Sequence, residues 1–175
     1  ITTRSEHLRI TASGSISSLG DFFKESEQGS AVSPTRLQVL AETKQLGKLV
    51  RFYNGDVPFE ASAEARGILT GSLRNFRIDD VVVTASGEHA DLQASGYLEK
   101  LGSPGGPWVD FGTEVSSDQL GRFVKSHGFD IPYSGRGFAQ GRVSGARGDV
   151  HVRGIDLELE SSSMTLKAGG TIGPI

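Results

Sequence analysis

The stretch Val150-His151-Val152-Arg153-Gly154-Ile155-Asp156-Leu157-Glu158-Leu159 alternates aliphatic residues with polar or charged residues over most of its length. A period of two is typical of a β-strand that has one buried face and one solvated face. The alternation resumes at Leu166 and Ala168, after the polar residues Ser161 to Ser163, which are typical of a hairpin turn. The sequence therefore predicts antiparallel strands joined by short turns.

The chain repeats itself at a distance of 74 residues. Leu46-Gly47-Lys48-Leu49-Val50 returns as Leu120-Gly121-Arg122-Phe123-Val124, so that 120 − 46 gives 74. Asp56-Val57-Pro58-Phe59 returns as Asp130-Ile131-Pro132-Tyr133 at the same distance, 130 − 56. A repeat of this length with many strands predicts a sheet that grows by repetition.

Part of a third copy opens the chain, because Leu8-x-Ile10-x-Ala12-x-Gly14 matches the pattern that ends in Ala94-x-Gly96. We therefore expect residues 1–19 to end a preceding repeat, 20–36 to form a linker or insertion, and 37–101 and 102–175 to form two complete repeats. Since neither end carries a capping pattern, we expect one continuous domain cut from a longer array.

Each repeat has the same predicted order of elements. Extended segments at 37–41 and 109–115 are followed by short helices at 43–53 and 117–127, where apolar residues are spaced i, i+3, i+4. Ser117 is a suitable N-cap for the second helix. Strands then follow, with a hairpin turn predicted at Gly87-Glu88 in the first repeat.

Composition excludes several classes of protein. The 24 glycines among 175 residues favour turns and short strands over a helical bundle. The absence of cysteine excludes disulfides and thiolate catalysis. The 18 basic and 21 acidic residues are interspersed, which argues against a nucleic-acid partner, and no apolar run is long enough for a spanning helix.

Catalytic and metal-binding patterns are also missing from the sequence. The four histidines, at 7, 89, 127 and 151, lie one per segment with no spacing that suggests a metal site. The carboxylate pairs Asp79-Asp80 and Glu158-x-Glu160 are each replaced by other residues at the distance of 74. We therefore predict that the protein is not an enzyme and uses no cofactor and no metal.

The apolar stripe of the strands is the candidate functional feature, because one short helix per repeat covers only part of it. A second sheet, the same sheet curled on itself, or an apolar ligand must complete the burial. The residues predicted on the apolar side are Leu8, Ile10, Leu37, Val39, Phe76, Ile78, Val81, Val83, Leu92, Phe111, Val150, Val152, Ile155, Leu157, Leu159 and Leu166. Their neighbours Arg77, His151, Asp156 and Glu158 are predicted to face solvent.

The repeat resembles the AsmA-like and TamB-like proteins, a family of repeating β-groove, bridge-like lipid-transfer proteins. The resemblance lies in the second repeat, in the pattern Asp118-x-Leu120-x-x-Phe123, then Gly128-x-Asp130-Ile131-Pro132, then Gly141-x-Val143-x-Gly145, then Val150-x-Val152-x-x-Ile155-x-Leu157-x-Leu159, and finally Leu166-x-Ala168-Gly169-Gly170-x-Ile172. It implies a mainly β fold, an antiparallel meander curled into an elongated, taco-like groove that is apolar inside.

The resemblance also implies a function. The chain would be a periplasmic segment of a protein that is anchored in the inner membrane by a part outside this sequence. It would shield phospholipid or other acyl chains on their way to the outer membrane. An outer-membrane protein would be a further partner. A different class stays open, namely a structural or adhesive β-sandwich or solenoid segment of a bacterial surface protein, whose apolar faces pack against each other.

Overall fold

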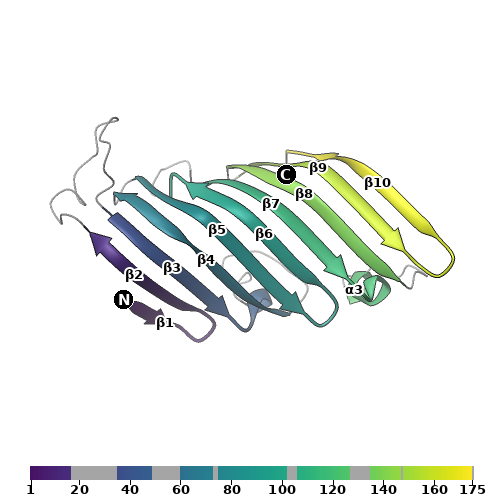
Figure 1. The fold of residues 1–175 in the computed structure, drawn as a ribbon, viewed down its shortest axis with the longest axis horizontal. Helices are drawn as coiled ribbons and strands as arrows, with labels where there is room; N and C mark the ends of the chain where they lie inside the picture. The colour runs from purple at the N-terminus through teal and green to yellow at the C-terminus, as the bar shows by residue number, and fades with distance from the viewer. Residues whose placement is uncertain are drawn as a thin grey trace.

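The described strands form one antiparallel sheet in which each strand pairs with the next along the chain (Figure 1). The computed structural model describes residues 1–16, 35–48, 60–72, 75–101, 106–126, 135–146 and 148–174. The ten strands are β1 (Thr2–Arg4), β2 (Arg9–Ile16), β3 (Thr35–Thr43), β4 (Ala61–Ser72), β5 (Asn75–Gly87), β6 (Asp91–Glu99), β7 (Trp108–Ser117), β8 (Arg136–Ala146), β9 (Asp149–Glu160) and β10 (Thr165–Ile172). The mainly β, antiparallel meander predicted from the sequence is confirmed.

The predicted strand and turn positions agree with this sheet. The extended segments 37–41 and 109–115 lie inside β3 and β7. The turns at Gly87-Glu88 and Ser161 to Ser163 join β5 to β6 and β9 to β10. β3 begins at Thr35, two residues before the predicted repeat boundary, and the rest of the predicted linker up to residue 34 lies outside the described residues.

The two predicted helices are shorter than expected where they are described. Residues 46–48 are helical in the first repeat, and residues 49–53 lie outside the described residues. In the second repeat α3 runs over Leu120–Ser126, and the predicted last residue, His127, is again outside. α3 begins three residues later than predicted, and the predicted N-cap, Ser117, is the last residue of β7. The Ser117 Oγ accepts a hydrogen bond from the Gln119 backbone N–H at 3.2 Å, just before the helix. No described helix is long and apolar enough to cross a membrane.

β5 and β9 each carry a β-bulge that keeps the apolar residues on one side. In β5, Asp80 and Val81 together lie opposite Gly67, and in β9 Gly154 occupies the corresponding place. Asp80 and Gly154 have φ angles of 51° and 59°, the left-handed conformation that glycine and aspartate tolerate best. Because the bulge adds one residue, Ile78 and Val81 face the same side although they are three positions apart.

The sheet is a single, open layer with little enclosed core. Only four hydrophobic residues of the described chain are buried, namely Ala61, Val81, Ala85 and Ala90. The sheet runs without a break across the predicted repeat boundary at 101/102, since β6 and β7 pair from Asp91 with Ser116 to Glu99 with Trp108. Both faces of most strands are therefore at least partly accessible.

Candidate functional site

One side of the sheet carries only uncharged, mostly aliphatic or small residues, and we call it the apolar face. Directly opposite residues of an antiparallel pair share a face, so the strand register assigns each side chain. One row crosses β2 to β8 through Ile10, Ala41, Ala65, Val83, Ala94, Thr113 and Gly141. A second row crosses β6 to β10 through Leu92, Val115, Ala139, Leu157 and Ala168.

The register brings the sequence-predicted stripe together on this face. Fifteen of the sixteen residues lie in strands, and their pairing partners place them on the same side. The sixteenth, Leu8, lies in the turn just before β2. Among the described strand residues that have a pairing partner, the register places no Asp, Glu, Lys, Arg or His on the apolar face. Asp80, in the bulge of β5, has no assigned partner.

Little of the described chain covers the apolar face. Ile16, Leu166 and Ile172, which the register places on it, are 38%, 42% and 55% exposed. Helix α3 lies over one end, because a Cβ added to Gly137 would come within 2.9 Å of the Leu120 side chain. The helix thus shelters the ends of β7 and β8, and most other described residues of the apolar face are half-buried.

The opposite side, which we call the polar face, carries the charged residues. The register assigns Arg77, His151, Asp156 and Glu158 to it through pairing with Thr70, Ser144, Gln140 and Phe138. A row of polar side chains crosses it through Arg9, Glu42, Glu64, Thr84, Gln93, Glu114, Gln140 and Asp156. The two faces therefore differ in charge along the whole described width of the sheet.

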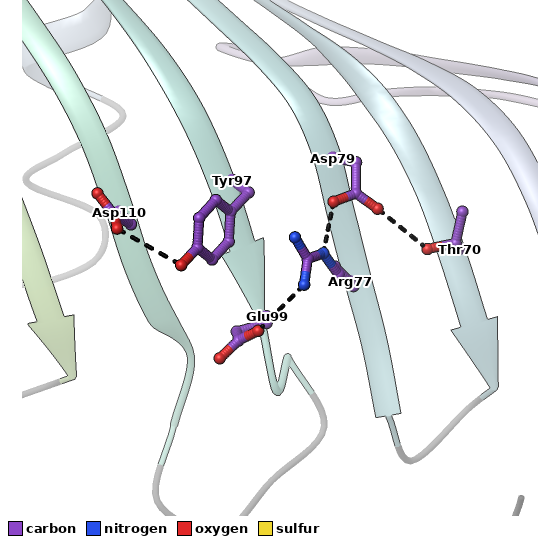
Figure 2. Close-up of polar contacts among 6 residues, drawn as sticks. All are labelled: Thr70, Arg77, Asp79, Tyr97, Glu99 and Asp110. Carbon is purple, nitrogen blue, oxygen red and sulfur yellow. Dashed lines mark hydrogen bonds and ion pairs between the residues drawn. The ribbon is translucent and has the colours of Figure 1, made fainter. Parts of the chain in front are cut away.

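Cross-strand ion pairs on the polar face hold β5, β6 and β7 in register (Figure 2). The Arg77 guanidinium donates hydrogen bonds to Asp79 and, at 3.4 Å, to Glu99 on β6. The same guanidinium lies over the Tyr97 ring, 4.6 Å from its centroid. The Tyr97 hydroxyl in turn donates to Asp110 on β7 at 3.4 Å. The sequence analysis did not find this network, because sequence alternation does not show which charges face each other across strands.

Arg142 on β8 extends the network through a two-point contact with Asp110. The guanidinium donates at 2.6 Å and 2.8 Å to the two carboxylate oxygens. These charge-assisted hydrogen bonds favour the ionised carboxyl and hold the pKa of Asp110 below its usual value. The pair therefore favours the folded chain as long as Asp110 is ionised.

Acid is expected to weaken the fold through this pair. Because the pKa of Asp110 is lower in the folded chain, its contribution to stability is present above the ordinary value of 3.8 and is lost as pH falls through the folded value. Between about pH 5 and about pH 3 the melting temperature of the parent should fall more than that of Asp110→Asn. The exposed Glu60→Gln variant is the control and should follow the parent. Equal losses in the parent and in Asp110→Asn would show that the pair contributes nothing.

Two hollows lie on the polar face. The larger has a volume of about 810 Å³, and among the residues around it are Glu42, Glu64, Thr84 and Gln93. The smaller, of about 360 Å³, lies between Arg142 and Arg153 and also reaches Gln93. Most of the residues around both hollows belong to the polar face. Leu8 and Leu92 of the predicted stripe also border the larger hollow.

Among the residues that the structure describes, no group of three His, Cys, Asp or Glu side chains is arranged to hold a metal ion. Comparisons with models of protein families, with curated proteins and with solved structures gave no match for this chain. The feature that extends across the described strands is the apolar face, which runs from β2 to β10.

Proposed function

We propose that the apolar face shields the acyl chains of phospholipids, and that the chain is a segment of a bridge-like lipid-transport protein. The observation that carries the proposal is the extent of this face. It extends from β2 to β10 without a charged side chain among the described residues that have a pairing partner, and large aliphatic residues on it, such as Leu166 and Ile172, are exposed. Apolar area of this extent on a soluble surface marks an interaction site.

The energetics favour a surface of this kind for lipid movement. An acyl chain of about fifteen methylenes in water is disfavoured by roughly 12 kcal/mol, at about 0.8 kcal/mol per methylene. A continuous apolar surface removes most of this barrier through many weak contacts and does not bind one lipid tightly. No catalytic residue is needed for that task.

The repeat also supports the proposal. The bulges at Asp80 and Gly154 are 74 residues apart (154 − 80), which is the distance of the sequence repeat. The register shifts of β6 against β5 and of β10 against β9 recur at the same distance. We propose that such units add strands to one sheet and that the sheet curls around the lipid tails, so that the apolar face becomes the inside of a groove.

The cellular setting follows from the family resemblance alone. It would place the protein in the periplasm, anchored in the inner membrane by a segment outside this sequence, with phospholipid or another acyl lipid as cargo. A protein of the outer membrane would receive the lipid. The proposal includes no enzyme activity and no cofactor.

A structural or adhesive role is the alternative. In a β-sandwich segment of a surface protein, the apolar face would pack against a second sheet. The described residues form one sheet only, so that the second sheet would have to come from another part of the protein or from another chain. The exposed Leu166 and Ile172 are compatible with contact to lipid and with packing against a second sheet.

Photocrosslinking tests the proposal directly. A photoreactive residue at position 78 or 152 on the apolar face should give phospholipid adducts in cells, and one at position 77 or 151 on the polar face should give few. Native mass spectrometry of the gently purified parent should show retained lipid. Adducts of equal yield from both faces, or protein adducts alone at 78 and 152, would contradict the lipid function and favour the structural role.

A further inference from the structure

Among the residues that the structure describes, the outer edge of β10 has no partner strand, and the sequence of β10 repeats that of β2 and β6, which are paired on both edges. Ile10-x-Ala12-x-Gly14 in β2 and Leu92-x-Ala94-x-Gly96 in β6 return as Leu166-x-Ala168-x-Gly170 in β10. On the edge that corresponds to the free edge of β10, β2 pairs with β3 and β6 pairs with β7. In the described chain β10 pairs with β9 only, and all its residues are exposed.

Glycine at two of these three positions has a clear cause. Gly14 pairs with Leu37, and a Cβ added there would overlap the backbone carbonyl of Arg36. Gly96 pairs with Phe111, and a Cβ there would overlap the carbonyl of Asp110. In both places the neighbouring strand approaches so closely that only glycine fits.

The third glycine has no such neighbour in the described chain. A Cβ added to Gly170 would meet nothing within 4 Å. A glycine in the interior of a strand costs about 0.5–1 kcal/mol relative to alanine, so its presence at this position needs a reason. A strand placed against β10 as β3 and β7 are placed against their partners would supply that reason.

We infer that the free edge of β10 is a strand-addition site whose occupant is an extended peptide segment with the residue pattern shared by β3 and β7. In the register of β6 with β7, a large apolar residue of the occupant lies opposite Gly170, as Phe111 lies opposite Gly96. Lys167, which pairs with Glu158 on β9 at 3.0 Å, then also faces the position of Glu114, a residue of opposite charge. Main-chain hydrogen bonds give affinity, and the alternation keeps the apolar face continuous. The inference does not depend on lipid binding.

Cysteine crosslinking with a synthetic peptide tests the register. The peptide carries residues 107–117 of this chain, and the protein carries Ala168→Cys as its only cysteine, because the parent has none. A peptide with Thr113→Cys should form a disulfide with position 168, since Ala94 pairs with Thr113 in the equivalent place. A peptide with Gly112→Cys presents its thiol on the other face and should react at least tenfold less.

The variant Gly170→Val tests whether position 170 is glycine because an added strand approaches it closely. Combined with Ala168→Cys, it should lower the disulfide yield at least tenfold, because the valine side chain occupies the place of the incoming carbonyl. Thr171→Val is the matched control on the same strand and should leave the yield unchanged. The melting temperature of Gly170→Val should be no lower than that of the parent, since nothing lies within 4 Å of the new Cβ and valine favours a strand.

Three results would overturn the inference. Equal yields from the Thr113→Cys and Gly112→Cys peptides would exclude the predicted register. An unchanged disulfide yield with Gly170→Val would show that close approach of an added strand does not explain the glycine. Efficient disulfide dimers of the Ala168→Cys protein that exclude the peptide would show that the edge is taken by a second copy of the chain. The register comparison does not depend on Gly170→Val, and stays decisive if that variant folds poorly.

Discussion

Replacing Gly96 with valine is expected to destabilise the sheet by about 3 kcal/mol or more. A Cβ at position 96 would overlap the carbonyl oxygen of Asp110 and lie 2.8 Å from the Cα of Phe111. Both are backbone atoms of β7, which cannot rotate away as a side chain can. β6 and β7 would have to separate, and they share a ladder that runs from Asp91 to Glu99. Urea denaturation followed by circular dichroism measures the loss.

Gly112→Val is the matched control for this prediction. Gly112 lies on β7 opposite Ser95, and a Cβ there would be 3.9 Å from the Ser95 carbonyl oxygen, an ordinary van der Waals distance. Valine also favours a strand, so we expect a change of less than about 1 kcal/mol in either direction. Equal losses for the two variants would show that the approach of β7 to β6 is not the cause.

Replacing Val83 with aspartate is expected to lower lipid retention and lipid crosslinking at least tenfold with little loss of stability. Val83 lies on the apolar face between Ala65 on β4 and Ala94 on β6. It is half-buried in an open sheet, so that a carboxylate there remains hydrated. The carboxylate would then lie in the path of the acyl chains, and an apolar tail in contact with it would cost several kcal/mol of desolvation. Native mass spectrometry and crosslinking from position 78 measure the effect.

Val82→Asp is a control with the same chemistry on the adjacent residue. Val82 lies on the polar face, between Arg66 on β4 and Ser95 on β6, so its carboxylate should leave lipid association unchanged. A large fall in melting temperature for Val83→Asp alone would point to a face that is closed by a second sheet. A carboxylate buried without a partner either destabilises the fold or takes up a proton. That result would favour the structural role over lipid transport.

The sequence by itself predicted the antiparallel meander, the turns at Gly87-Glu88 and Ser161 to Ser163, and the alternation of faces within a strand. The period of two in 150–159 assigns Val152 to one face and His151 to the other, because successive side chains of a strand point in opposite directions. These features are local, so the order of residues along the chain is enough to predict them.

The contacts between side chains on different strands depend on strand register, so only the tertiary structure could show them. Arg142 and Asp110 are 32 residues apart, and nothing in the sequence showed that they would form a two-point ion pair across β7 and β8. The sequence likewise does not show why position 96 needs glycine. The reason is the carbonyl group of Asp110 on β7, which occupies the place that a Cβ would take. Register is set by the pairing of whole strands and by bulges such as the one at Asp80, so each cross-strand contact depends on residues far away in the sequence.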